Sequence, residues 1–361
     1  VKQAKRATLD QLGCQLIGST LEWNKPAYYY IRDFEGKAES TIVNYGTKAL
    51  VHDAAYVNAT FGQGAELDDV SEQGGGHMGA MCVPVALALS EKNRIGGREF
   101  LTAIVIGYQV AWGVGRLMYP GLIARGFHPQ SVVGVFAAAA VAGRLLGLKP
   151  DQVVNAFGIA GSHAGGTMEY DKGGGEVKRI HAGIAVRGGI QSAMLAGYGL
   201  TGPRSILEGE RGICPLFGGQ CRTERFTLDK EWGVLSQTFK TYSCVRTLHS
   251  SIDALSKLIA EHSIRPEQVA KIEVDLSEVS LKHGATIVEP QDVVGAQFSL
   301  AYSLAIRLLK GSNDLEVYMD PELWRNSQVL SLARKVEAHA DPEMQEEKRF
   351  ASRMRVTLKG G

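Results

Sequence analysis

The stretch GQGAELDDVSEQGGGHMGA, residues 62–80, separates two apolar helical patterns and has neither helical nor strand periodicity of its own. It contains four acidic residues, three successive glycines and one histidine, His77. Loops that a rigid scaffold holds in place often carry binding and catalytic groups. Acidic residues and glycines are equally common in a solvated connection. The stretch by itself therefore leaves a catalytic loop and a plain surface loop as open interpretations.

Helical patterns surround this loop throughout the first two hundred residues. The spacing of leucines near the N-terminus predicts an amphipathic helix over residues 2–18. Further helices are predicted over residues 47–60, 83–91, 97–119, 131–146, 150–163 and 180–198. The segment 131–146 is rich in alanine, and its small side chains allow neighbouring helices to approach closely.

Two more polar loops interrupt the helical pattern, at residues 121–129 and 165–176. Together with the first loop, they carry or precede three chemically versatile side chains, those of His77, His128 and Lys178. If the helices pack antiparallel, alternate loops lie at the same end of the bundle. The sequence therefore predicts that these three side chains come together.

After residue 218 the sequence changes character, because alternating and β-branched segments appear between helical ones. Strands are predicted over residues 272–276, 354–358 and 316–318, and helices over 250–262 and 291–309. This is α+β patterning, and we place a domain boundary between residues 218 and 237. The predicted fold is mainly α, with a large all-helical domain over residues 1–230 and a smaller α+β domain over residues 231–361.

The composition argues against several classes of function. The 361 residues include 39 Lys or Arg and 38 Asp or Glu, so no overall field favours nucleic acid or an anionic membrane. The longest apolar run, residues 100–114, contains polar side chains and is too short to span a bilayer. The five cysteines are odd in number and form no CxxC pair, which indicates reduced thiols. We expect a cytoplasmic protein that binds neither nucleic acid nor membrane.

Common nucleotide and metal motifs are absent from the sequence. It has no GxGxxG after a strand, no GxxxxGKS or GxxxxGKT, no HExxH and no GxSxG. The clustered Cys and His spacing of a structural zinc site is absent as well. His52, His163, His181 and His262 fall within helical patterns and are interpreted as packing or surface residues.

Four blocks taken together resemble a known family. They are ELDD at residues 66–69, GFHPQSVVGVFAAAAVAGRLLGL at 126–148, EVKRIHAGIAVRGGIQSAMLAGYGLTGPRSILEG at 176–209 and FKTYSCVRTLH at 239–249. Their succession resembles the MmgE/PrpD family, which includes 2-methylcitrate dehydratase, cis-aconitate decarboxylase and iminodisuccinate epimerase. The resemblance covers nearly the whole chain.

This resemblance implies a large helical domain with a smaller α+β lid, and an active site between the two. It also implies a homodimer that uses neither a metal nor an organic cofactor. Members of the family have helices that return to the large domain after the lid. These helices are missing here, so the chain is expected to be truncated.

The resemblance also assigns roles to individual residues. It gives catalytic roles to Glu66, His77, His128 and Lys178, and substrate-binding roles to Asp68, Asp69, Lys240 and His249. The loop before His77 is about one residue longer than the family pattern. The sequence departs from the family pattern at Glu66 in place of Asp, Val70 in place of Thr, Met78 in place of Pro, and Val245 in place of Cys or His. These departures lie in or beside the presumed pocket.

The residue types suit proton transfer on an acidic substrate. Histidine exchanges protons near neutral pH without tuning, so His77 and His128 are the candidate acid and base. Glu66 or Asp68 could orient an imidazole or act as a base itself. Capping of the loop end is the alternative role for the acidic pair, and for Asp69 it is as well supported as catalysis.

Two lysines and two glycine runs suit the carboxylates of such a substrate. Lys178 and Lys240 offer compact cations, and charge-assisted hydrogen bonds of this kind are strong. The glycines at residues 74–76 and 173–175 would let backbone amides approach an anion.

The sequence therefore favours a cofactor-independent lyase that dehydrates a small di- or tricarboxylate such as 2-methylcitrate. Epimerisation and decarboxylation by the same site stay open as alternatives. A homologue that binds a carboxylate metabolite without catalysis is the alternative from a different class, and Val70, Met78 and Val245 motivate it.

Overall fold

The computed structural model describes residues 1–71, 74, 76–226, 231–344 and 350–360. The chain divides into two compact units, residues 1–170 with 176–239 and residues 171–175 with 240–361. The boundary predicted after residue 230 falls next to residues 227–230, which lie outside the described residues. Most described residues are helical, which confirms the prediction of a mainly α fold.

Helices make up most of the first unit. They are α1 (Lys2–Gly18), α2 (Lys25–Arg32), α3 (Val51–Gln63), α4 (Met78–Asn93), α5 (Gly97–Met118), α6 (Gly121–Ala124), α7 (Pro129–Val132), α8 (Gly134–Leu145), α9 (Pro150–Ala160), α11 (His181–Gly197) and α12 (Ile213–Gly218). The short helix α10 (Tyr170–Gly173) begins at the last residue of the first unit's 1–170 segment, and its other residues are assigned to the second unit. Short 3-10 helices include η2 (Gly161–His163), η3 (Glu176–Ile180) and η5 (Gly233–Leu235). Two small antiparallel pairs join β1 (Ser40–Thr41) to β2 (Lys48–Ala49) and β3 (Val70–Ser71) to β4 (Gln237–Thr238).

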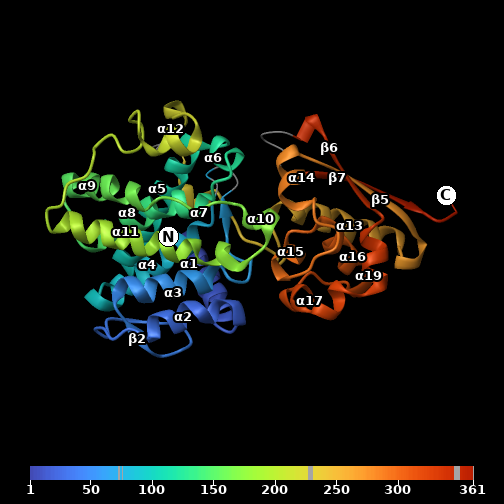
Figure 1. The fold of residues 1–361 in the computed structure, drawn as a ribbon, viewed down its shortest axis with the longest axis horizontal. Coiled ribbons are helices and arrows are strands. Elements are labelled where there is room, and N and C mark those ends of the chain that lie inside the picture. Colours follow the sequence, from blue (N-terminus) through green and yellow to red (C-terminus); the bar gives the residue numbers. More distant parts are fainter. Residues whose placement is uncertain (72–73, 75, 227–230, 345–349, 361) are drawn as a thin grey trace. The chain divides into compact units, whose positions relative to one another are not determined.

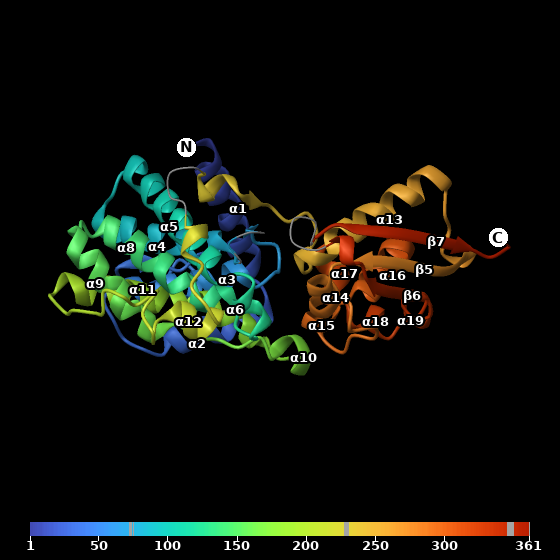
Figure 2. The same cartoon turned by 90° about the horizontal axis from the view of Figure 1, so that it is seen from above.

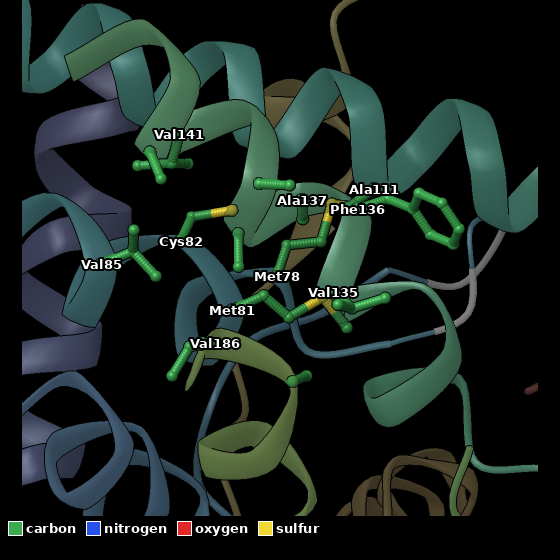
Figure 3. Packing of buried hydrophobic residues seen from close by; sticks show 14 of the residues in the cluster. Met78, Met81, Cys82, Val85, Ala111, Val135, Phe136, Ala137, Val141 and Val186 are labelled. Atoms are coloured by element: carbon green, nitrogen blue, oxygen red, sulfur yellow. The ribbon is translucent and has the colours of Figure 1, made fainter. Parts of the chain in front are cut away.

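The core of the first unit lies among α4, α5, α8 and α11, with α3 packed along α4 and α11 (Figure 1). Figure 3 shows how their apolar side chains meet inside the unit, with Cys82 of α4 near Val141 of α8. Ala111 of α5 and Val186 of α11 belong to the same cluster. These side chains are almost completely buried, and this removal of apolar surface from water drives the packing.

Small residues bring these helices close together. A Cβ atom added at Gly189 of α11 would lie 2.4 Å from the Cβ of Ala138 in α8. A Cβ atom added at Gly107 of α5 would lie 2.4 Å from Cγ2 of Val141 in α8. The close approach predicted for the alanine-rich segment is confirmed at these contacts, and it fixes the helices that carry the polar loops.

The start of α4 differs from the prediction. The helix begins at Met78 rather than Val83, and it contains Pro84. The carboxylate of Asp69 accepts a hydrogen bond from the backbone N–H of Gly79, with 2.8 Å between the atoms. Because the first N–H groups of a helix have no partner inside it, this bond stabilises a first turn that glycine-rich sequence alone does not predict.

The second unit combines helices with a three-stranded sheet (Figure 2). Its elements are α13 (His249–His262), β5 (Val269–Leu276), α14 (Glu278–Gly284), α15 (Val293–Gln297), α16 (Leu300–Lys310), α17 (Leu315–Met319), α18 (Pro321–Trp324), α19 (Ser327–Ala333), β6 (Val336–Ala340) and β7 (Ser352–Leu358). Strand β5 lies in the middle, parallel to β6 and antiparallel to β7. The predicted strands at 272–276 and 354–358 are therefore confirmed.

Two local predictions in this unit are wrong, and one strand was missed. Residues 316–318 belong to helix α17, because a three-residue apolar alternation does not distinguish a strand from one helical turn. Strand β6, with the sequence VEAHA, was not predicted, because a mostly exposed edge strand lacks clear alternation. The helix predicted over 291–309 is two helices, because Ser299 caps α16 by accepting from the N–H of Tyr302.

One described helix, α5, is long and apolar enough to cross a membrane by length and composition. Within its most apolar 18-residue window, 61% is buried inside the structure. The core helix of a soluble protein passes the same test, so α5 is weak evidence for a membrane span.

Candidate active site

The acidic loop begins with a buried glutamate in an unusual backbone conformation. Glu66 follows the end of α3, and its φ of 57° lies in the left-handed region that few non-glycine residues adopt. Its carboxylate accepts a hydrogen bond from the ammonium of Lys178, which lies in η3 of the third loop. Both side chains are about 95% buried, with 4% and 5% of their surface exposed. This ion pair joins the first and third loops.

The next acidic residue, Asp68, lies beside His77. One carboxylate oxygen of Asp68 is 3.2 Å from Nδ1 of His77, and the backbone oxygen of Asp69 is 2.9 Å from the same nitrogen. Both neighbours only accept hydrogen bonds, so Nδ1 carries the proton and Nε2 is the nitrogen that exchanges protons. A carboxylate in this position orients the ring and stabilises the imidazolium form.

Asp69 has a different role. Besides the bond to Gly79 in the first turn of α4, its second oxygen accepts a hydrogen bond of 2.9 Å from the hydroxyl of Tyr108 in α5. These contacts favour the capping role over contact with a substrate. The assignment of Asp69 to substrate binding stays a prediction.

Gln130 joins the first loop to the second. Its side-chain oxygen accepts from the N–H of His77 at 2.9 Å, and its side-chain nitrogen donates to the carbonyl of His77 at 3.0 Å. Gln130 lies in the first turn of α7, two residues after His128, which is the N-cap of that helix. The N–H of His128 donates to the carbonyl of Gly166 in the third loop. Hydrogen bonds therefore connect all three loops.

The second loop presents His128 to another buried histidine. Nδ1 of His128 lies 2.8 Å from Nδ1 of His181, the first residue of α11. The ring of Tyr170 meets both imidazoles edge-on, at centroid distances of 5.5 Å and 6.0 Å. Among the described residues, His181 is the hydrogen-bond partner of the His128 side chain, and this bond uses Nδ1. Nε2 of His128 is therefore available to a substrate.

The surroundings keep this imidazole pair neutral. Burial is the main reason why the pKa of His128 lies well below its ordinary value of 6.5. His181 and the cation of Lys178 lower this pKa further, and His77 acts in the same direction. The carboxylate of Glu66 opposes them. Burial and then Lys178 lower the pKa of His181 to about 4.

The first unit thus brings together five of the residues proposed from the sequence: Glu66, Asp68, His77, His128 and Lys178. Sequence reasoning missed His181 and Gln130 as members of this cluster. The block KRIHAG, in which His181 follows Lys178 by three residues, was the signal that could have pointed to His181. Among the described residues, no three His, Cys, Asp or Glu side chains are arranged to hold a metal ion.

Lys240 and His249 belong to the second unit. Both are buried, and Nε2 of His249 lies 3.4 Å from the backbone oxygen of Cys244. The ring of Tyr242 lies 5.1 Å from the imidazole of His249. Their assignment to substrate binding stays a prediction. Of the two glycine runs, Gly75 lies outside the described residues.

Comparison with known proteins agrees with this arrangement of elements. Residues 1–225 match the model of the MmgE/PrpD N-terminal domain, and residues 242–361 match that of the MmgE/PrpD C-terminal domain. The chain is 32% identical to the cis-aconitate decarboxylase-like protein oryM of Aspergillus oryzae, over 93% of this chain and 74% of that protein. It is 28% identical to the cis-aconitate decarboxylase of Aspergillus terreus, over 99% and 78% of the two chains. The human cis-aconitate decarboxylase is also 28% identical, over 95% of this chain and 73% of its own length. From the two domain matches and these relatives, we conclude that the chain belongs to the MmgE/PrpD family.

Proposed function

We propose that this chain is a cofactor-independent lyase that acts on a small tricarboxylate and releases one carboxylate as carbon dioxide. The relatives named as cis-aconitate decarboxylases support this reaction type. The structural observation that carries the proposal is a buried cluster in which a proton donor, His77 beside the carboxylate of Asp68, occurs together with the cation of Lys178. The same cluster contains a contrast between two histidines. His77 lies beside a carboxylate, whereas His128 lies beside a neutral imidazole and near a cation.

This contrast divides the work between the two imidazoles. The Asp68 carboxylate favours the charged form of His77, which makes His77 the proton donor. Burial and Lys178 favour the neutral form of His128, which makes its Nε2 the proton acceptor. Environments that push two titratable groups in opposite directions are a common basis for acid and base roles in enzymes.

Decarboxylation of an unsaturated tricarboxylate needs one proton donor and a nearby cation that stabilises the negative charge of the intermediate. When the carboxylate leaves as carbon dioxide, one C–C bond breaks and its electron pair moves into the conjugated system, onto a neighbouring carboxylate. Lys178 supplies positive charge where this negative charge develops, which is the most effective form of transition-state stabilisation. His77 then gives one proton from Nε2 to carbon, and it recovers that proton from solvent.

Dehydration of a hydroxy tricarboxylate is the second candidate, and the presence of both an acid and a base favours it. Nε2 of His128 would take a proton from carbon while His77 protonates the departing hydroxyl. Such an elimination uses both imidazoles, whereas decarboxylation requires only the donor. The two reactions therefore differ in their dependence on His128.

Incubation of the purified chain with cis-aconitate, citrate and 2-methylcitrate tests the proposal. Proton NMR of the products and trapping of carbon dioxide would report decarboxylation, whereas an alkene without carbon dioxide would report dehydration. His77→Asn should reduce turnover by about a hundredfold or more, as expected for a general acid. His262→Asn, on the exposed end of α13, is the matched control and should leave turnover unchanged.

Three outcomes would contradict the lyase proposal. Deuterium exchange from D2O into an otherwise unchanged substrate would indicate an epimerase. Binding of cis-aconitate in calorimetry without turnover of any candidate would indicate a non-catalytic homologue. Turnover that survives both His77→Asn and His128→Asn would place the chemistry elsewhere.

A further inference from the structure

The pair of His128 and His181 restricts where protons can lie. Their Nδ1 atoms are 2.8 Å apart, which is hydrogen-bond distance. A neutral imidazole carries one proton, on either Nδ1 or Nε2. Two nitrogens can form a hydrogen bond only if one carries a proton and the other offers its lone pair. In the neutral pair, one ring must therefore be the Nδ1–H tautomer and the other the Nε2–H tautomer.

This restriction fixes the chemistry of Nε2 in His128. If His128 donates from Nδ1, its Nε2 is bare and can accept a proton from a substrate. If His181 donates instead, Nε2 of His128 carries the proton and can only give it. The state of one ring thus determines the state of the other.

The surroundings hold both rings in place. His128 is 5% exposed and His181 is 4% exposed. The ring of Tyr170 covers the pair edge-on, and Gly166 packs against His181 with its missing Cβ position 3.3 Å from Cε1. Lys178 on η3 acts on both rings and disfavours a second proton on the pair. The other charged or titratable groups that act on His128 are His77 and Glu66.

We propose that His181 is a positioning residue that shares a single proton with His128 through their paired Nδ1 atoms and thereby determines whether Nε2 of His128 accepts or donates a proton. The catalytic consequence rests on the proposed function. The pairing itself does not, because it can be measured without a substrate.

Imidazole NMR tests the pairing directly. In the full chain labelled with 15N-histidine, long-range 1H–15N correlations distinguish the two tautomers of each ring. At pH 7, one of the two rings should be Nδ1–H and the other Nε2–H, with the shared proton shifted far downfield. Two Nε2–H tautomers, or a doubly protonated ring at this pH, would overturn the proposal.

Two substitutions separate the pairing from simple packing. The amide of His181→Asn can lie near the position of Nδ1 and still form a hydrogen bond, but it cannot titrate. His181→Phe fills the space and removes the bond. Both should change the 15N resonances of His128, whereas His163→Asn, a half-buried histidine of η2, should leave them unchanged. Unchanged 15N resonances of His128 in both variants would contradict the proposal. If His181→Phe does not fold, His181→Asn alone decides, because an amide partner changes the 15N shift of the paired Nδ1 even where it keeps the tautomer.

Kinetics then test the positioning role. If the reaction is the dehydration, in which His128 is the base, His181→Phe should lower kcat by about a hundredfold, and His181→Asn by less, because a hydrogen-bond partner is kept. If the reaction is the decarboxylation, which requires only His77 as donor, both variants should keep a kcat near that of the wild type. Since His181 contributes to the low pKa of His128, the acid limb of kcat/KM for the dehydration should move to higher pH in both variants. A rise in KM with an unchanged pH profile would show that His181 only supports the fold. Correct tautomers without any turnover would count against the proposed function and leave the pairing intact.

Discussion

At the scale of single residues, the most consequential feature is the buried pair of Glu66 and Lys178. Each charge is removed from water and stabilised by the other. The left-handed backbone at Glu66 adds to the cost of this arrangement, because non-glycine residues rarely adopt that conformation. Such a combination is retained when it positions a group for chemistry, which agrees with the role proposed for Lys178.

Replacing Lys178 by methionine should therefore be strongly destabilising. The carboxylate of Glu66 would stay buried without this cation, and breaking a buried pair typically costs about 3–5 kcal/mol in free energy of unfolding. The double variant with Glu66→Gln should recover part of this loss, because the uncompensated charge is gone. Urea denaturation of the single and double variants measures both effects.

An exposed ion pair gives the matched control for this experiment. Lys282 and Glu278 of α14 are 73% and 60% exposed. Lys282→Met should change the free energy of unfolding by about 1 kcal/mol or less. If Lys178→Met lowered the free energy of unfolding no more than Lys282→Met does, the buried pair would not be important for stability.

The neutral imidazoles predict a dependence of stability on pH. The pKa of His128 and that of His181 are lower in the folded state than in the unfolded chain. As the pH falls below about 6.5, the unfolded chain therefore binds protons that the folded protein does not bind, and stability decreases. Each such group contributes at most about 1.4 kcal/mol per pH unit, and for His181 the loss ends near its folded pKa of about 4.

Thermal unfolding between pH 4 and pH 7.5 measures this dependence. The variant with both His128→Asn and His181→Asn should lose less stability on acidification than the wild type. Equal pH dependence in the two proteins would show that these histidines are not the neutral buried groups described above.

The residues of the site were predictable to different degrees. His77 and His128 stood out because each ends a polar loop between apolar helices. His181 did not, because it is the first residue of a helix and its partner lies 53 positions earlier in the chain. A periodic pattern shows which face of a helix is buried. It does not show which polar group of another element a side chain on that face will contact.

At the scale of elements, glycines, which have no side chain, determine how closely the helices pack. In α11, Gly189 faces Ala138 so closely that Gly189→Ala should force the two helices apart and destabilise the fold by about 1–3 kcal/mol. In α1, no atom lies within 4 Å of a Cβ added at Gly13. Gly13→Ala should therefore stabilise the protein by about 0.5–1 kcal/mol through higher helix propensity.

The melting temperatures of these two variants should move in opposite directions. A shift in the same direction for both would mean that propensity alone, rather than contact between α8 and α11, decides the effect of glycine in these helices.

Helices were predicted well where their apolar pattern is long. Their boundaries were predicted badly where a single hydrogen bond determines the first or last residue of the helix. The helix over residues 2–18 was found as predicted. The start of α4 depends on Asp69, and the break before α16 depends on Ser299, so a single side-chain hydrogen bond moved each boundary. Such bonds depend on three-dimensional neighbours that periodicity does not report.

At the scale of the whole molecule, the two units have separate cores. Ile272 of β5 is fully buried in the second unit, and Ile272→Ala should cost about 2–5 kcal/mol there. Hydrogen exchange measured by mass spectrometry should become faster in β5, β6 and β7. Exchange in α4, α8 and α11 should stay unchanged, because local opening is confined to cooperative units.

Ile190→Ala in α11 is the reciprocal variant, since Ile190 is fully buried in the first unit. It should accelerate exchange in α8 and α11 and leave the sheet of the second unit unchanged. Acceleration in both units by either substitution would contradict separate cores.

The fold class was predictable because it depends on many residues at once. The change from helical to alternating patterns extends over more than a hundred residues, so single errors do not alter it. The roles of Lys240 and His249, in contrast, come only from resemblance to the family. No local pattern in the sequence indicates what a buried lysine or histidine of the second unit binds.

The anchoring of the acidic loop has a consequence for the position of His77. The N–H of Ser71 donates to the carbonyl of Gly76, and on its other side Ser71 pairs with β4. Both ends of the segment between Ser71 and Gly76 are therefore held by main-chain bonds. Because Gly76 directly precedes His77, the position of this imidazole depends on β4 (Gln237–Thr238), which lies far along the chain near the end of the first unit.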